Sequence, residues 1–76
     1  MEIKLSDIHP GQRAYLLDIP GSCPLKRRLR QFGIEQGAVA QCRFFSPGKH
    51  LVALEFEGTT LALRRADLAA ITARLC

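Results

Sequence analysis

The stretch that decides the fold is AVAQCRFFSPGKHLVALEFEGTTLALR, residues 38–64. Within it, residues 51–57 end in an alternation of apolar and charged side chains, LEFE at 54–57, which is the period of a strand with one buried face. We expect Val52, Leu54 and Phe56 to face inward, whereas the two glutamates of this segment face water. A strand of this kind needs neighbours, and the residues on either side of it supply them.

Two further strands are predicted in the same stretch. Residues 38–45 precede the tetrapeptide SPGK at 46–49, whose proline and glycine suit a tight hairpin. Residues 60–64 follow a second turn, EGT, and have the composition of another strand. The residues predicted to share one side of the segment 38–45 are Ala40, Cys42 and Phe44.

The flanking segments complete a small β-rich domain. Residues 13–19 are predicted to form a strand with Tyr15, Leu17 and Ile19 on one face and Ala14 and Leu16 on the other, and residues 5–8 have the spacing of a helical turn. Residues 66–70 are expected to form one more helical turn. Residues 71–75 alternate as a closing strand would, although they are also compatible with a longer helix, and the strand is preferred. About five short strands between regular turns are typical of a small barrel or sandwich.

The segment PLKRRLRQFGIEQG, residues 24–37, has the spacing of a short amphipathic helix. Pro24 suits the first turn, and Gly33 suits the αL position that ends a helix, with Ile34 folding back over the last turn. The apolar stripe predicted to dock on the sheet consists of Leu25, Leu29 and Phe32. The basic residues predicted on the far side are Lys26, Arg27 and Arg30. Solvation alone, a protein partner and nucleic acid are the three explanations of this face.

The composition limits the kinds of partner and compartment. The 76 residues suffice for one small domain, the net charge is +4 and the pI is near 9.4, which favours acidic partners. The three cysteines, Cys23, Cys42 and Cys76, form no close pair, so we expect a reducing compartment, the cytoplasm. Cys42 is expected in the core, and the other two at the surface. Neither a signal peptide nor a membrane span is expected.

No catalytic or metal-binding pattern is present. The chain lacks a P-loop and a GxSxG nucleophile motif, so we expect no enzyme activity and no bound cofactor. Candidate metal ligands exist, but none forms a histidine pair at i, i+4 or a close cysteine pair, so no metal site is predicted. These candidates are His9, His50, Asp7, Asp18, Asp67, Glu55, Glu57 and the three cysteines.

Four blocks of sequence, in order and at these spacings, carry a family resemblance. The blocks are LSDIHPG at 5–11, LRQFGI at 29–34 with Gly37, Pro47-Gly48, and LALRR at 61–65 with Asp67. Over nearly its whole length the chain resembles the ferrous iron transport protein A (FeoA) family. One block departs from the family, in which a longer hairpin of the form Ala-Pro-Leu-Gly-Asp-Pro is frequent. The loop here is SPGKH at 46–50, shorter and basic, so any partner surface at this loop should differ.

The resemblance implies a mainly β fold, a small SH3-like barrel of about five strands with one short α-helix between the first two strands. It implies a single domain over residues 1–76. It also implies a cytoplasmic, non-enzymatic accessory protein of bacterial Fe²⁺ uptake that acts with the membrane transporter FeoB, whose cytoplasmic part binds GTP. Similar domains occur at the C-terminus of iron-dependent repressors, so a role with a metal-dependent transcriptional regulator is the alternative.

The predicted partner surface combines the basic helix face with the hairpin tip. Short loops over a shallow groove can hold a protein segment, and basic side chains around it would set encounter rate and orientation. A nucleic-acid-binding barrel is the remaining alternative, although no strand carries the paired exposed aromatics that such a module uses. The residues predicted to bind the partner are Lys26, Arg27, Arg30, Lys49 and His50.

Overall fold

The computed structural model describes residues 1–76, and its backbone forms one antiparallel sheet with short helical segments. The strands are β1 (Glu2–Lys4), β2 (Arg13–Asp18), β3 (Val39–Phe45), β4 (Leu51–Phe56), β5 (Thr59–Arg64) and β6 (Thr72–Leu75). The α-helices are α1 (Lys26–Gln31) and α2 (Arg65–Leu68), and the 3-10 turns are η1 (Leu5–Asp7) and η2 (Pro47–Lys49).

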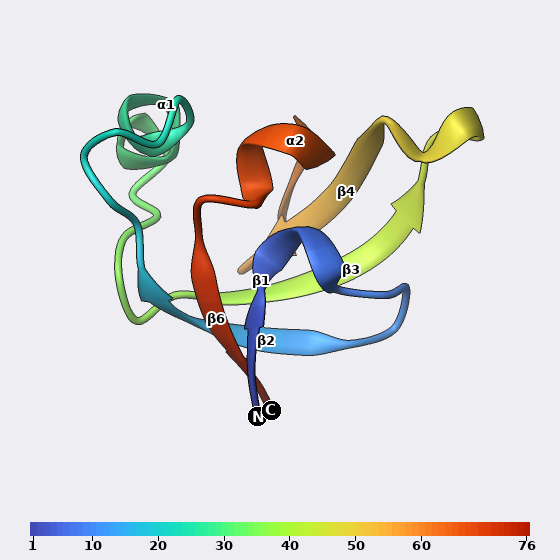
Figure 1. The fold of residues 1–76 in the computed structure, drawn as a ribbon, viewed down its shortest axis with the longest axis horizontal. Helices are drawn as coiled ribbons and strands as arrows, with labels where there is room; N and C mark the ends of the chain where they lie inside the picture. The colour runs from blue at the N-terminus through green and yellow to red at the C-terminus, as the bar shows by residue number, and fades with distance from the viewer.

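The sheet has the strand order β1-β6-β2-β3-β4-β5 and every neighbouring pair is antiparallel. Figure 1 shows the sheet bending around a common interior, with α1 beside one end, the η2 turn at the other and α2 between them. The two termini lie side by side because β1 pairs with β6. The mainly β architecture predicted from the sequence is confirmed.

All five predicted strands are present, and a sixth strand was missed. β2, β3, β4 and β5 match the predicted segments within a residue or two, and residues 72–75 form a strand rather than a longer helix. The sixth strand, β1, pairs its three residues with β6 at the sheet edge. Ile3 is partly buried, and the other two residues of β1 are exposed. An edge strand of three residues is too short to show an alternating pattern in the sequence, so the pattern could not predict it.

The hairpin of β4 and β5 follows the predicted alternation. Val52, Leu54 and Phe56 are buried as expected, and all six residues of β4 are paired with β5. Glu57 and Gly58 both have positive φ, 47° and 87°, which is the backbone of a two-residue hairpin turn whose twist matches that of the strands.

The prediction that Phe44 lies on the same side as Ala40 and Cys42 is wrong. The register of β3 against β4 shifts between Cys42 and Phe44, so one extra residue, Arg43, is inserted at a β-bulge. Beyond the bulge the inward and outward positions exchange. Phe44 is therefore 60% exposed, and Phe45 packs against the core in its place.

Helix α1 ends as the sequence predicts. Gly33 has a φ of +74°, its N–H donates to the carbonyl of Arg30 at 2.9 Å, and the N–H of Ile34 donates to the carbonyl of Leu29 at 2.9 Å. These two bonds form a Schellman motif, which satisfies carbonyls at the helix end. No side chain caps the other end of the helix.

The predicted apolar stripe of α1 is only partly correct. Leu25 and Leu29 are buried, but Phe32 is 52% exposed. The helix has six residues, and Phe32 is its C-cap, with φ and ψ outside the helical region. Ile34 folds back over Leu29 and is buried, so it takes the place on the sheet that the stripe assigned to Phe32.

The core is entirely apolar. A single cluster of 19 buried residues joins the sheet to both helices, including Leu29 of α1 and Leu68 of α2, and no polar or charged residue is buried. Every ionisable side chain except those of the two buried cysteines therefore lies at the surface or near it. This arrangement confines any recognition chemistry to the outside of the molecule.

The different environments of Leu29 and Phe32 give a matched test of the packing. We expect Leu29→Ala to lower the free energy of unfolding by about 2–5 kcal/mol, because it removes a fully buried side chain and leaves a cavity. Phe32→Ala in the same helix should lower it by less than about 1 kcal/mol. Urea denaturation of both variants measures the two values. Equal losses would contradict the assignment of Ile34, rather than Phe32, to the core.

Candidate interaction surface

The first candidate surface is the α1 basic face, formed by Lys26, Arg27 and Arg30. Arg27 and Arg30 are exposed and Lys26 is partly exposed. This face separates two shallow depressions. One, of about 320 Å³, lies between α1 and the loop that follows it, and the other, of about 470 Å³, lies against residues 21–24. None of the three cations takes part in an ion pair within the chain.

The second candidate surface is the η2 turn, which carries Lys49 and His50. Gly48 and Lys49 both have positive φ, 81° and 61°, so the turn projects outward as a tight loop. The N–H of Leu51 donates to the hydroxyl oxygen of Ser46 at 3.0 Å and closes the loop. The N–H of Arg65 donates to the carbonyl of His50 at 2.9 Å and ties the loop to the start of α2.

A cluster that the sequence analysis missed lies beneath the η2 turn. The Arg65 guanidinium carbon lies 4.6 Å from the centroid of the Phe45 ring, and the Lys49 ammonium lies 6.0 Å from it. The His9 ring is tilted against the same ring at 6.5 Å between centroids. Phe45 is therefore the centre of a cation–π cluster. No pattern in the sequence indicates that these residues meet, because they lie up to 56 positions apart.

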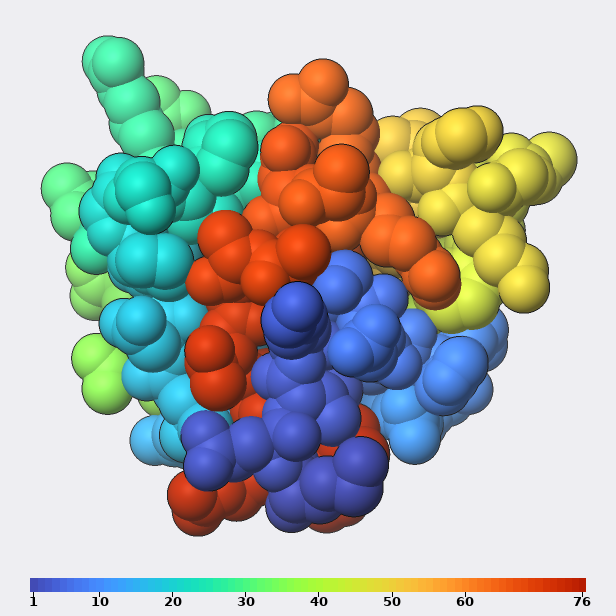
Figure 2. Space-filling view, in the orientation of Figure 1, coloured from blue at the N-terminus to red at the C-terminus, as the bar shows by residue number.

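The structure divides the five predicted partner-binding residues into two groups. Lys26, Arg27 and Arg30 lie together on α1, and Lys49 and His50 lie together at η2. Figure 2 shows α1 (cyan to green) and the η2 region (yellow) on opposite flanks, with α2 (orange) between them. The two groups thus share one side of the molecule without forming a continuous patch.

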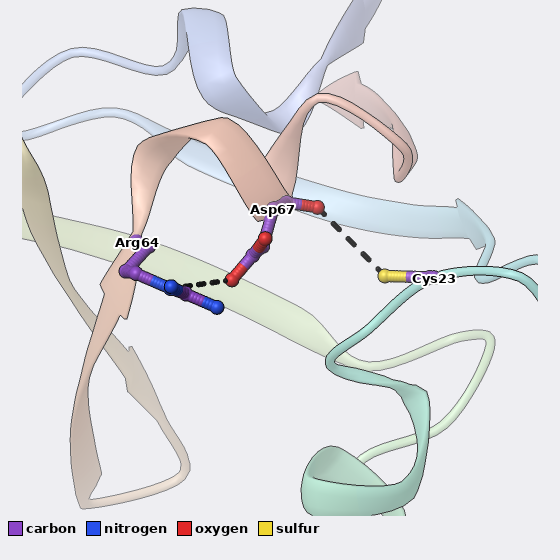
Figure 3. A network of polar contacts seen from close by, with 3 residues as sticks. All are labelled: Cys23, Arg64 and Asp67. Atoms are coloured by element: carbon purple, nitrogen blue, oxygen red, sulfur yellow. Dashed lines mark hydrogen bonds and ion pairs between the residues drawn. The ribbon is translucent and has the colours of Figure 1, made fainter.

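A small polar network joins α2 to the segment before α1. The Cys23 thiol lies 3.8 Å from the carbonyl oxygen of Asp67, and the Arg64 Nε donates to the Asp67 carboxylate at 2.9 Å. Figure 3 shows Cys23 reaching from the chain before α1, while Arg64 and Asp67 come from the end of β5 and from α2. The expectation that Cys23 is exposed is wrong, since its contact with α2 buries it.

The cysteines differ in their environment and hence in their chemistry. Cys23 and Cys42 are buried, Cys76 is exposed, and all three are free. Burial raises the pKa of the Cys42 thiol above its ordinary value of 9.0, and the nearby positive charge of Arg65 opposes this shift. Cys42 is therefore a protonated core side chain at neutral pH and a poor nucleophile.

Two geometric findings bear on metal ions and membranes. Histidine, cysteine, aspartate and glutamate side chains do not come together in groups of three or more, which is the minimum for a protein-built metal site. No helix has the length and apolar character needed to cross a bilayer.

Comparison with models of known protein families shows which family the chain belongs to. The model of the FeoA domain matches residues 3–75. The chain belongs to the FeoA domain family. This family is linked to ferrous iron transport and is an accessory, transport-related family rather than a known enzyme family. No curated protein sequence matches the chain.

Solved structures of FeoA proteins share the fold. The FeoA protein of Chlorobium tepidum superposes with a TM-score of 0.86 and 27% identity, over 96% of this chain and 70% of that one. The FeoA of Stenotrophomonas maltophilia, a zinc complex described as a prokaryotic SH3 domain protein, superposes with a TM-score of 0.72 and 21% identity, over 93% and 88%. The chain therefore has the SH3-like fold that its sequence predicts.

The same fold occurs within larger regulators. A manganese-dependent transcriptional repressor contains a region that superposes with a TM-score of 0.84 and 14% identity, over 99% of this chain but only 42% of the repressor. At this identity the likeness concerns the fold alone. It shows that a domain of this shape is also used as one part of a longer protein.

The burial of Cys42 predicts a dependence of stability on pH. The folded chain holds the Cys42 proton to a higher pH than the unfolded chain does. The stability gained from the buried thiol is therefore complete below the ordinary pKa of 9.0 and is lost as the pH rises through the raised pKa. We expect the free energy of unfolding to fall more steeply across this range for the wild type than for Cys42→Ala. Denaturant titrations at several pH values measure the slopes.

Cys76→Ala is the matched control for this measurement, because the Cys76 side chain is exposed and should leave the slope as it is in the wild type. Identical slopes in all three proteins would contradict a raised pKa at Cys42.

Proposed function

We propose that this protein is a cytoplasmic, non-enzymatic accessory protein of bacterial ferrous iron uptake that docks on the cytoplasmic part of the transporter FeoB and regulates it. Membership of the FeoA family supports the link to iron transport. The observation that carries the docking proposal is the surplus of free surface cations. Of the eleven lysines and arginines, only Arg43 and Arg64 pair with a carboxylate of the chain.

One partner face is large enough to cover both candidate surfaces. A stable interface buries about 800 Å² on each partner, which corresponds to a patch roughly 30 Å across. The longest dimension of the molecule is 29 Å. The α1 basic face and the η2 turn, on the same side of the molecule, therefore fit within a single interface.

The cations and the apolar groups would have different roles in this interface. Exposed cations at the rim of an interface mainly raise the rate of encounter and fix orientation, and salt screens them. In this proposal the exposed side chains of Phe32 at the end of α1, and of Phe44 and Leu51 on either side of η2, supply apolar area. Docking can change the state of the transporter only to the extent that the protein binds two of its states with different affinity. Regulation of this kind needs no catalytic group in the accessory protein.

Charge reversal on α1 tests the docking surface. We expect Arg27→Glu combined with Arg30→Glu to keep the fold and to weaken binding to purified FeoB about tenfold, because two attractive rim charges become repulsive. FeoB-dependent Fe²⁺ uptake in cells should fall with it. Binding at several salt concentrations and uptake of radioactive iron are the measurements.

Arg13→Glu combined with Arg74→Glu is the matched control. It reverses the same number of exposed charges on β2 and β6, away from α1. If the α1 variant binds FeoB and supports uptake as well as this control and the wild type do, the α1 basic face is not part of the docking surface.

A further inference from the structure

We propose that Phe45, Lys49 and Arg65 form an anchoring site for a carboxylate group from an acidic segment of a partner protein. We call these three residues the Phe45 site. This inference rests on the proposed function, because the partner would be the one that the accessory protein docks on. It assigns to η2 and α2 a specific chemical task, the recognition of Asp or Glu side chains.

The first support is the unsatisfied guanidinium of Arg65. Its carbon lies 4.6 Å from the Phe45 ring centroid, so the ring and the planar cation form a cation–π pair. Its Nε is buried and makes no hydrogen bond. An arginine that packs against an aromatic ring keeps its N–H edge for a planar oxyanion, and a buried donor without a partner is costly. Arg65 is therefore held against the ring without a hydrogen-bond partner in the chain, and the part of its side chain that remains accessible lines the pocket described next.

The second support is the concentration of positive charge without a counter-ion. Lys49 and Arg65 approach the same ring, and neither forms an ion pair within the chain. The adjoining shallow pocket of about 360 Å³ is lined by Lys49, His50, Arg64, Arg65 and Ala66. No acidic side chain lines it, and of its cations only Arg64 has a counter-ion, Asp67. An anion in this pocket would relieve the repulsion between the cations.

The third support is exposed apolar surface on the outer face of the sheet, where Leu51 pairs with the pocket residue Arg64, and this surface favours a protein segment over a phosphate group. Phe44 pairs with Ala53 in the sheet register, and Leu51 lies two residues before Ala53, so Phe44 and Leu51 share the outer face. They are 60% and 38% exposed. A segment with an acidic and an apolar side chain would match both the charge and this face.

Nucleic acid fits the same surface less well. Phe44 is the only large exposed aromatic residue on β3, β4 and β5, whereas single-stranded nucleic acid is bound on successive aromatic platforms. The pocket also holds a compact group of cations rather than a basic groove that follows a phosphate backbone.

The free Nε–H of Arg65 supplies a direct readout. In the ¹⁵N-labelled full chain we would follow the Arg65 Nε–Hε resonance while adding the peptide acetyl-Glu-Glu-Leu-Glu-amide. The expected result is a saturable shift of this resonance that the neutral peptide acetyl-Gln-Gln-Leu-Gln-amide does not produce. Inorganic phosphate and an eight-residue oligothymidylate are titrated in parallel at the same ionic strength, and both should bind more weakly than the acidic peptide.

Two variants locate the binding. Lys49→Asn removes one charge and suits the positive φ of this position, and Arg65→Lys keeps the charge but removes the planar fork. Each should weaken the acidic peptide about fivefold, as followed through the backbone resonances around the pocket. Arg74→Gln, an exposed position on β6, should leave the affinity unchanged. If Arg65→Lys does not fold, Lys49→Asn alone decides the question.

Each contrary outcome overturns the inference. Equal shifts from the acidic and neutral peptides would indicate an apolar contact without carboxylate recognition. Tighter binding of phosphate or oligothymidylate would assign the site to phosphoryl groups. The FeoB assay separates this inference from the proposed function. If Lys49→Asn and Arg65→Lys bind FeoB as the wild type does while the α1 variant does not bind, the docking proposal is supported and the assignment of the Phe45 site is wrong. If the acidic peptide binds as expected but FeoB does not, the Phe45 site is supported and FeoB is not the docking partner.

Discussion

Burial of aliphatic side chains on the inside of one curved sheet is the constraint on which the rest of this structure depends. A chain of 76 residues hides only about 60% of the surface that it exposes when unfolded. Here 20 residues are buried, and all of them are hydrophobic. Such a thin core cannot also enclose a cavity lined with charged groups, because each buried charge would need a buried partner. The division between an inert interior and a charged exterior follows from the size of the chain.

The bulge in β3 shows how one local irregularity in the core creates a surface feature. Without the extra residue at Arg43, simple alternation would place Phe44 inward and Phe45 outward. With it, Phe44 stands on the outer face of the sheet and Phe45 lies at the edge of the core, where the Arg65 guanidinium reaches its ring. Bulges frequently re-aim side chains near functional sites. The apolar face and the cation–π cluster therefore have a common origin.

The sequence predicts the parts of this structure that local physics decides. The inward face of β4 and the αL glycine after α1 are set by alternation and by backbone conformation, so both were predicted correctly. Phe32 and Phe44 were misplaced because their positions depend on a helix end and on a strand register. Those features are decided by tertiary packing. β1 was missed because an edge strand of three residues has almost no inward face.

The sequence predicts which cations belong to the candidate surface but not how they are arranged in space. Lys49 and His50 are identifiable as the tip of a basic hairpin, but no pattern in the sequence shows that Lys49 meets Phe45 and Arg65. These residues meet because β5 runs back along β4, so that the end of β5 and the start of α2 lie beside η2.

α2 also contacts the other flank. The carbonyl of Asp67 lies against the Cys23 thiol, which joins α2 to the segment before α1. A partner that displaced α2 on one flank would therefore disturb the chain that carries the basic residues on the other. Coupling of this kind requires an element with two arrangements. α2 has only four residues, but its Leu68 is fully buried in the core and the N–H of Arg65 is bonded to the carbonyl of His50. Displacing α2 would expose Leu68 to water, so only a partner that covers this side chain in turn can stabilise a second arrangement.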